Sequence, residues 1–493
     1  MYRPLRSKIG SSEQFQLPFE GKLSEENRWV NLARLVPWEE FESEYAAKFS
    51  PTRGSPAKPF RVALGALIIK ERLGTSDEET VEQIRENPYL QYFLGFSEYT
   101  DMAPFEASML VHFRKRISLD FVGRVNERIV QQARKSAGAK AEPEGSVPGE
   151  GETATGSSGQ LIVDATVAPA DIRYPTDLQL LNEAREHTEA IIDSLYEQVT
   201  DELEKKPRTH RQRARGEFLE LSKKRRPSIK QRRKGIGKQL GYVRRNLAHI
   251  DRLMAAGACL SGLSRHQYRT LLVVSELFRQ QQQMYEQRSH RVDDRIVSIA
   301  QPHIRPIVRG KAGTAVEFGA KLSGSCCDGF VFVERLSWDQ FNEAGDLPQQ
   351  AENYKARCGH YPETLYADRI YRTRENRRWC QERGIRLMGS PLGRVSEAQK
   401  AELARQARAD EKVRNQIEGK FGQGKRRFGL ARVMAKLAST SATVIGITFL
   451  VINLEKLLQQ LFFLYCCGLQ VLLPWRGRGQ TSRNQQYWLS IVG

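Results

Sequence analysis

The chain has 493 residues, enough for about three domains of roughly 150 residues each and for a large buried core. Its formal charge of +19 at pH 7 favours a polyanionic partner, because Lys and Arg that neutralise phosphates release counterions. Seven cysteines without a C-x-x-C pair argue against both a disulfide framework and a structural zinc site. Since no apolar run follows Met1 as a signal peptide would, we expect a protein of the reducing cytoplasm.

Residues 1–135 are predicted to form a compact helical domain. An apolar helix over Phe60–Leu73 should end at Gly74, and the capping-box text Ser76-Asp77-Glu78-Glu79 should open the next helix. Pro88 begins a further apolar turn, and Pro104 precedes a basic helix that carries His112, Arg114, Lys115 and Arg116. Short helices with a basic last helix fit a helix-turn-helix type of DNA-binding domain, while a plain helical bundle is the alternative.

Residues 136–160 are predicted to be a flexible linker. They are rich in Gly, Ser, Glu, Pro and Ala and contain almost no large apolar residue, so they cannot bury enough surface to fold. Their acidic residues would also keep them away from a DNA surface.

Residues 161–177 are predicted to begin the next domain with a strand, Leu161–Val167, whose β-branched residues suit a sheet. A long helical insertion is then expected over residues 178–300. Counting residues 205–245 gives 17 basic and two acidic side chains, a net +15 of the total +19. The insertion is therefore predicted to bind DNA, with a solvated helical face as the alternative. Its candidate contacts are Lys223, Lys224, Arg225, Arg226, Arg232, Arg233 and Lys234.

Strands are expected to resume in residues 301–435. The segments 315–322 and 330–333 alternate apolar residues around Cys327-Asp328-Gly329, which is a good hairpin signal. Another strand is predicted over 364–367, then a helix over about 373–383 ended by Gly384, and a strand over 385–388. An amphipathic helix containing Glu418 follows. This order predicts an α/β fold with an RNase H-like mixed sheet and flanking helices.

Residues 436–493 are predicted to contain C-terminal apolar helices and a tail. The segment Ala442–Trp475 could be mistaken for a membrane span, but Glu455, Lys456, Gln459 and Gln460 interrupt it. Neither half then reaches the 18 to 20 apolar residues that a span needs. We expect a buried helix pair and no membrane partner.

Three carboxylates stand where this fold would bring them together. Asp164 and Asp368 end apolar strands, and Glu418 lies in the last helix of the order. An Asp on the first strand, an Asp at the end of the fourth and a Glu on the helix after the fifth is the arrangement of DDE transposases. The sequence resembles the bacterial insertion-sequence transposases over most of its length.

The residues around Asp368 and Glu418 strengthen the resemblance. Arg414, Glu418 and Lys425 match the family signature of Tyr, two residues, Arg, three residues, Glu, six residues and Lys, with Glu411 at the tyrosine position. The text after Asp368 is similar to the family's Asp-x-Gly-Tyr, with Ile370 where glycine is common.

The resemblance implies a catalytic site that holds two Mg²⁺ ions, for which Mn²⁺ can substitute. Asp164 would bridge both ions, with Asp368 on one and Glu418 on the other. Arg414, Lys425, Arg426 and Arg427 would contact DNA phosphates, although an intrahelical ion pair is the plain alternative for Arg414. The implied partners are double-stranded DNA, as terminal inverted repeats and target, and a second copy of the chain in a homodimer. In a bacterial cell such a protein would lie in the cytoplasm, at the nucleoid.

Three functions therefore remain open. The first is a transposase that cuts and joins the terminal inverted repeats of its own insertion sequence. The second is a catalytically silent or domesticated DNA-binding protein derived from one. The third is an RNase H-fold nuclease.

Overall fold

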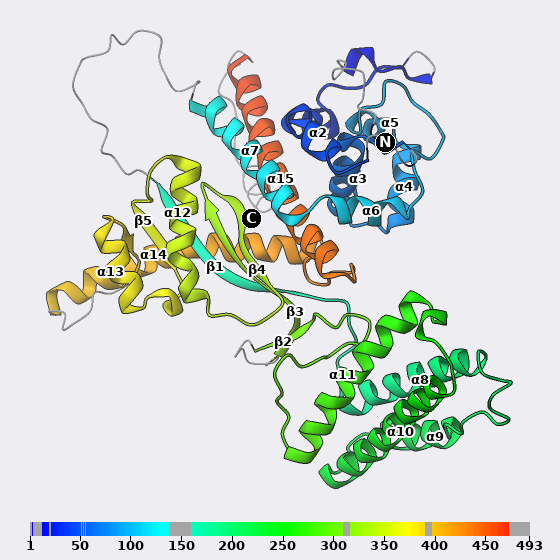
Figure 1. Cartoon of the computed structure of the whole chain (residues 1–493). Coiled ribbons are helices and arrows are strands. Elements are labelled where there is room, and N and C mark those ends of the chain that lie inside the picture. The colour runs from blue at the N-terminus through cyan, green and yellow to red at the C-terminus, as the bar shows by residue number, and fades with distance from the viewer. Residues whose placement is uncertain are drawn as a thin grey trace.

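The protein combines a mixed sheet with helices on both of its faces, an N-terminal group of helices and a separate helical bundle (Figure 1). The structure is a computed structural model that describes residues 2, 12–18, 21–50, 52, 54, 56–138, 159–308, 316–389 and 397–472. Residues 139–158 of the predicted linker and the predicted tail beyond Leu472 lie outside the described residues.

The N-terminal helices have the ends that were predicted at Gly74 and Pro88. They are α1 Arg28–Leu35, α2 Trp38–Ala46, α3 Phe60–Leu73, α4 Asp77–Glu86, α5 Pro88–Phe93, α6 Met109–Arg116 and α7 Leu119–Gly138. Gly74 ends α3 in the left-handed conformation, which glycine adopts without steric cost. Ser76 caps α4 by accepting a hydrogen bond from the Glu79 N–H, but the Glu79 carboxylate accepts from Gln83 instead of completing the predicted capping box.

The basic helix α6 is less available to DNA than its sequence suggests. Arg114 is buried, and its Nη1 and Nη2 donate to the two carboxylate oxygens of Asp77 at 3.0 and 2.5 Å. Such a bidentate pair fixes α6 against the start of α4. His112 and Lys115 remain exposed on the same helix.

The sheet has the predicted mixed α/β arrangement. Its strands are β1 Gln160–Pro169, β2 Arg305–Val308, β3 Val316–Cys327, β4 Phe330–Ser337, β5 Thr364–Ala367 and β6 Arg386–Leu387. The order is β2-β3-β1-β5-β6, with β4 also paired to β3. β1 is antiparallel to β3 and parallel to β5. Asp328 and Gly329 both take positive φ in the β3–β4 turn, as the Asp-Gly hairpin signal predicts.

Two helices cover opposite faces of this sheet. Gly324 of β3 pairs with Asp164 of β1, and the Phe421 ring of α14 (Glu397–Arg427) lies against Gly324. The neighbouring residue Ser323 faces the other way and accepts a hydrogen bond from Gln350 of α12 (Leu347–Cys358) at 2.6 Å. Asp164 therefore lies on the α14 face. A further helix, α13 Arg374–Glu382, links β5 and β6.

The insertion between β1 and β2 is a helical bundle with its own core. Its helices are α8 Asp177–Tyr196, α9 Arg211–Ser222, α10 Ile229–Ala255 and α11 Arg265–Gln287. Two clusters of buried apolar residues lie entirely within it, including Leu181 and Val274 in one and Ile192 and Leu253 in the other. The bundle therefore buries apolar surface without help from the sheet. Short 3₁₀ helices occur at Ser12–Gln14, Leu260–Gly262, Glu343–Asp346 and Arg369–Tyr371.

The apolar C-terminal segment forms one helix, α15 Ala438–Leu472, so the predicted helix pair is wrong. Residues Ala438–Phe463 are long and apolar enough to cross a membrane, and the polar residues do not divide them as predicted. The protein itself buries 78% of an 18-residue apolar window within this stretch. The charge of Glu455 is tolerated there because Arg72 Nε lies 2.5 Å from its carboxylate.

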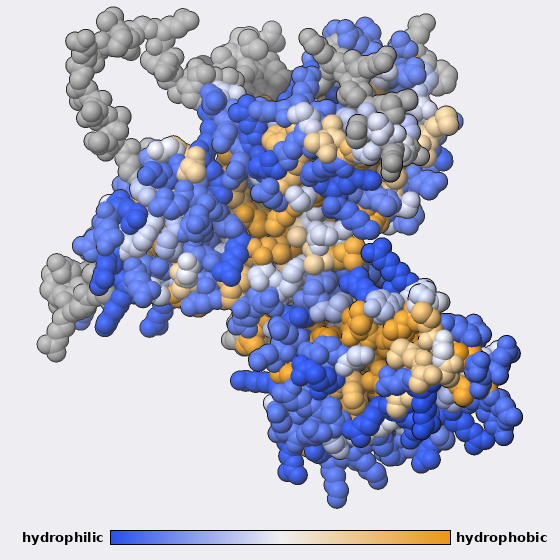
Figure 2. Space-filling view, viewed as in Figure 1, coloured by the Kyte–Doolittle hydropathy of each residue, from blue (hydrophilic) through white to orange (hydrophobic). Residues whose placement is uncertain are grey.

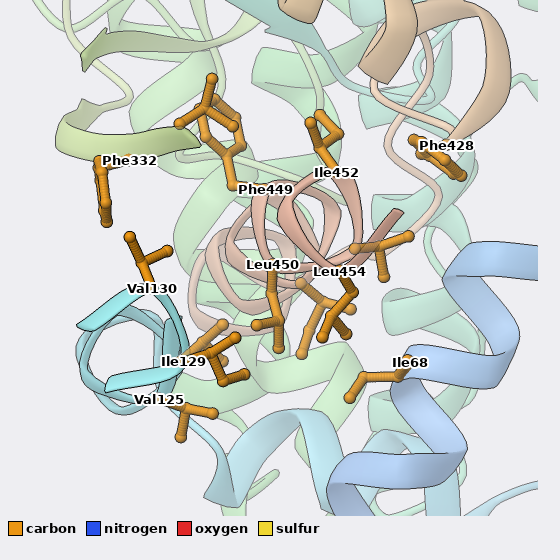
Figure 3. Packing of buried hydrophobic residues seen from close by; sticks show 14 of the residues in the cluster. Ile68, Val125, Ile129, Val130, Phe332, Phe428, Phe449, Leu450, Ile452 and Leu454 are labelled. Carbon is orange, nitrogen blue, oxygen red and sulfur yellow. The ribbon is translucent and has the colours of Figure 1, made fainter. Parts of the chain in front are cut away.

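Helices α7 and α15 lie side by side and join the N-terminal helices to the sheet at β4 (Figure 3). Val130, Phe332 and Leu450 come from these three elements and belong to one core cluster. At the same place, Asn453 accepts from the Val331 N–H at 2.8 Å and donates to the Val331 carbonyl at 2.8 Å, which also accepts from Asn126. Buried backbone groups at the outer edge of β4 are thus satisfied by side-chain amides.

A buried carboxyl at the same junction should make stability depend on pH. Burial raises the pKa of Glu71 to about 7, although Thr448, Lys70 and Arg114 partly oppose the shift. Because the folded pKa exceeds the unfolded one, the native state binds the proton more tightly, and stability is lost as pH rises from about 4.5 to about 7. Glu71→Gln should remove this loss and stabilise the protein at pH 8 by up to about 3 kcal/mol.

Urea unfolding of both proteins at pH 5 and pH 8 tests this expectation. The urea concentration at the unfolding midpoint of the wild type should decrease from pH 5 to pH 8. The midpoint of Glu71→Gln should change less. Glu86→Gln is the control, because Glu86 is exposed at the end of α4. Equal pH profiles for wild type and Glu71→Gln would contradict the assignment.

Candidate active site

The two predicted aspartates occupy adjoining positions on neighbouring parallel strands. Asp368 follows β5 as predicted, but Asp164 lies in the middle of β1, because this strand continues to Pro169 by pairing with β3, and the predicted strand end at Asp164 is wrong. In the β1–β5 register, Val163 is opposite Ala367, so Asp164 and Asp368 are the next residues of the two strands. Asp164 accepts a hydrogen bond from the Ala165 N–H at 2.8 Å, and Asp368 accepts one from the Arg369 N–H at 2.6 Å. Both carboxylates are therefore held close to the backbone at the point where the pairing of β1 with β5 ends.

Glu418 reaches this place because α14 packs closely against the sheet. Ile417 and Phe421 of α14 are buried, and a side chain at Gly324 would meet the Phe421 ring at 3.1 Å. The glycine opposite Asp164 thus allows the close approach of the helix. Glu418 stands one residue after Ile417 and remains about half exposed.

Arg414 lies between the carboxylates. Its Nη1 is 2.8 Å from Glu418 Oε1 and 3.9 Å from Asp164 Oδ2. On the other side, Glu411 accepts from Arg414 Nη2 at 2.6 Å and from Nε at 3.0 Å. The intrahelical ion pair considered for Arg414 is therefore present, and Glu411 at the signature's tyrosine position helps to hold the guanidinium.

The surroundings of Asp164 disfavour its ionised form. Burial raises its pKa to about 6, and the nearby charges of Glu418 and Asp368 add to the rise, while the Ala165 N–H and Arg414 oppose it. The three carboxylates are thus close enough to repel one another. An ionised Asp164 at neutral pH lacks a full counter-charge.

The three carboxylates suit a divalent metal ion in kind, although they lie too far apart to hold one in this arrangement. Among the described residues, no three His, Cys, Asp or Glu side chains are grouped closely enough to hold a metal ion. Arg414 lies between Asp164 and Glu418, so a closer approach of these carboxylates requires the guanidinium to move. Three converging hard oxygen donors, one of them buried and short of positive charge, nevertheless fit Mg²⁺ or Mn²⁺.

Comparison with known proteins identifies the family. Residues 365–455 match the transposase DDE domain, and residues 17–116 match the transposase domain (DUF772). A Rhizobium meliloti relative, the uncharacterized protein ORF8 in the nfe locus, is 31% identical over 178 residues, 36% of this chain and 79% of the relative. The chain belongs to the DDE-type transposases of bacterial insertion sequences. No solved structure matches the transposase. Its mixed sheet is accordingly RNase H-like, and the match spans Asp368 and Glu418.

The basic residues that end α14 have different surroundings. Arg427 Nη2 lies 3.9 Å from Glu455 Oε2, and its guanidinium stacks over Phe428, so this side chain also links α14 to α15. Arg426 is exposed, with its guanidinium near Gly422. Lys425 is partly buried. In the transposase, Arg426 is therefore the most accessible of the three to a phosphate.

Two groups of cations can be distinguished within the basic run of the insertion. Four of its cations pair with carboxylates inside the bundle, namely Lys206 and Arg211 with Asp193, and Arg213 and Lys238 with Glu217. The second group lies in the α9–α10 connection and the first turns of α10, where Ser228 and Gln231 form a capping box. We call it the basic tip; it comprises Lys223, Lys224, Arg225, Arg226, Arg232, Arg233 and Lys234.

The basic tip presents most of its charge to solvent. All of its side chains except Arg233 are exposed, and Arg233 stacks over Tyr285 at 4.2 Å. Lys224 makes an exposed pair with Glu220, but within the described chain Arg225, Arg226 and Lys234 pair with no carboxylate. In Figure 2 the lower surface of the insertion is mainly hydrophilic. The N-terminus of α10 adds its partial positive charge to the same place.

Sequence reasoning missed two parts of this site. The first is Gly324, whose lack of a side chain admits Phe421 of α14 opposite Asp164. The second is the contact between Glu411 and Arg414: the sequence marks Glu411 as a departure from the signature and as a rival to Glu418 on the same helix face, but not as a partner of Arg414. The spacing of Glu411, Arg414 and Glu418 could have revealed the second, because residues three and four apart share a helix face.

Proposed function

We propose that the transposase cuts and joins DNA at the terminal inverted repeats of its own insertion sequence, with divalent metal ions held by Asp164, Asp368 and Glu418. The observation that carries the proposal is the position of Asp368 and Glu418 near Asp164, where the charges of both raise the pKa of Asp164. Asp164 and Asp368 follow paired positions of β1 and β5, and Glu418 is held over them by the packing of Phe421 on Gly324.

Each residue has a role that follows from its position. When bound, the metal ions would supply positive charge to the attacking and leaving oxygens of an in-line displacement. Asp164 is the most buried of the three carboxylates and lies near both of the others, so it would suit a ligand shared by two ions. If Glu418 held a metal ion, the guanidinium of Arg414 would lose that ion pair and would be available to hold a phosphate beside the reacting bond.

Two further surfaces support contact with double-stranded DNA. The basic tip offers seven Lys and Arg side chains on a bundle that leaves the sheet directly after β1. His112 and Lys115 of α6 offer a second, smaller surface in the N-terminal helices. Because the two ends of an element must be joined together, we propose that the active form is a homodimer.

Removal of the metal tests the chemistry. Purified protein is incubated with duplex DNA ending in the element's terminal repeat and a target plasmid, with Mg²⁺, Mn²⁺ or EDTA. We expect a cleaved strand with a 3′-OH and its joined product with either metal, and neither product with EDTA.

The same assay separates the other functions. Cleavage without joining would identify a nuclease, and binding without either product would identify a silent DNA-binding protein. Joining that persists in EDTA would refute the metal-dependent mechanism. Thermal unfolding with Mn²⁺ gives an independent readout, because a metal that binds the native state must raise the melting temperature of wild type.

A further inference from the structure

Two cysteines from distant parts of the sequence share one arginine on the face of the sheet opposite Asp164. Cys327 is the last residue of β3 and is buried, and Cys358 is the last residue of α12 and is partly exposed. Arg134 of α7 donates from Nη1 to Cys358 Sγ at 2.9 Å and from Nη2 to Cys327 Sγ at 2.7 Å. The same Nη2 lies 2.9 Å from Asp328 Oδ2. One guanidinium therefore brings both sulfurs to a single place.

The two sulfurs have different protonation tendencies. A hydrogen bond from Cys327 and the charge of Arg134 hold the pKa of Cys358 well below its usual range. The same hydrogen bond, together with burial, raises the pKa of Cys327. A hydrogen bond from Tyr354 also lowers the pKa of Cys358, while burial opposes the lowering. Cys358, which is also the more exposed of the two, is thus the nucleophile, and the buried Cys327 is a neighbouring thiol that can donate its proton to Asp328 Oδ2 at 3.6 Å.

We propose that Cys327 and Cys358 are a reversible oxidation site that forms a disulfide when the protein meets a peroxide. The Cys358 thiolate attacks the O–O bond and becomes a sulfenic acid, and the hydroxide that leaves takes up a proton as water. The Cys327 sulfur then attacks the Cys358 sulfur, and the S–OH group leaves as a second water with the Cys327 proton. Two thiols are oxidised by two electrons while one peroxide is reduced to two waters.

The bond would act on three elements that meet at this place. It would tie the end of α12 to the β3–β4 turn, and it would remove the thiolate that Arg134 of α7 now faces. Arg134 would keep Asp328 as its partner. The site does not depend on the proposed DNA chemistry, because none of these groups lies on the Asp164 face.

Peptide mapping of the full chain tests the proposal. The reduced protein is treated with graded hydrogen peroxide, blocked with N-ethylmaleimide, digested and analysed without reductant. We expect a linked peptide pair containing Cys327 and Cys358 that dithiothreitol separates. Peroxide that leaves both residues open to alkylation, or that links either of them to another cysteine instead, would overturn the proposal.

Matched variants distinguish this site from general thiol oxidation. Cys326→Ser should leave the linked pair unchanged, because Cys326 is the buried neighbour on the opposite face of β3. Cys358→Ser should leave Cys327 reduced at the same peroxide concentration. Arg134→Gln should slow the alkylation of Cys358 at pH 7 by about tenfold, since a thiol with an ordinary pKa is only a few per cent ionised there. An unchanged alkylation rate in Arg134→Gln would contradict the role of the arginine.

Discussion

Asp164→Asn should lose strand cleavage and joining by at least about a thousandfold while the protein stays folded. Loss of a carboxylate shared by two metal ions removes several kcal/mol of transition-state stabilisation, and each 1.36 kcal/mol is tenfold in rate. The amide should not weaken the fold, because Asn can still accept the Ala165 hydrogen bond and needs no counter-charge in its buried position. At pH 8 the variant should be as stable as wild type or more stable, since ionisation of a carboxyl with a raised pKa opposes folding.

Asp171→Asn is the matched control for this experiment. Asp171 follows the same strand, and its carboxylate pairs with Arg432 instead of facing the other acids. It should retain most of the cleavage activity. Cleavage rates are measured on the end-repeat duplex, and the fold of each variant is followed by thermal unfolding. Normal activity of Asp164→Asn would remove Asp164 from the catalytic set.

Replacement of the four loop cations of the basic tip, Lys223, Lys224, Arg225 and Arg226, with Gln should weaken DNA binding about 10² to 10³-fold near 0.15 M salt. Each phosphate contact contributes about 0.9 to the slope of log affinity against log salt concentration, so the slope should fall by about 3 to 4. The residues are exposed in a loop, and their replacement should not disturb the two cores of the bundle. Titration of a labelled end-repeat duplex at several salt concentrations measures both quantities.

A smaller change with a matched charge loss serves as the control. Arg225→Gln/Arg226→Gln is compared with Arg279→Gln/Arg405→Gln, whose arginines are exposed but already pair with Glu276 and Glu402. Only the first double variant should reduce the salt slope, by about 2. If both double variants change the slope equally, the effect reflects total charge and not a contact at the basic tip.

Local patterns in the sequence predicted much of the fold. Gly74, Pro88 and the Asp328-Gly329 turn mark element ends through backbone conformations that few other residues adopt, and the structure has those ends. The strands that carry Asp164 and Asp368 were visible as short apolar runs. The strand order β3-β1-β5-β6 could be predicted only with the help of the family resemblance. Pairing between strands that are distant in the chain leaves little trace in the local sequence.

Contacts between distant residues account for what the sequence did not reveal. Glu455 appeared to interrupt the apolar segment, but Arg72, far away in the chain, neutralises it and allows a single helix. Arg114 appeared available to DNA, but Asp77 holds it in the core. In both cases the composition of a segment gives the charge, and only the fold supplies its partner. The catalytic assignments of Asp164, Asp368 and Glu418 remain predictions for the experiments above.

The paired amides at β4 bear on how copies of this transposase can assemble. An edge strand normally offers its free N–H and C=O groups to any extended segment that approaches, including the same strand of another molecule. Here Asn126 and Asn453 already occupy both groups of Val331, and α7 and α15 cover the strand beside them. Continuous sheet formation across two subunits is blocked on this side. The proposed homodimer should therefore not form by pairing of the β4 strands of its two copies.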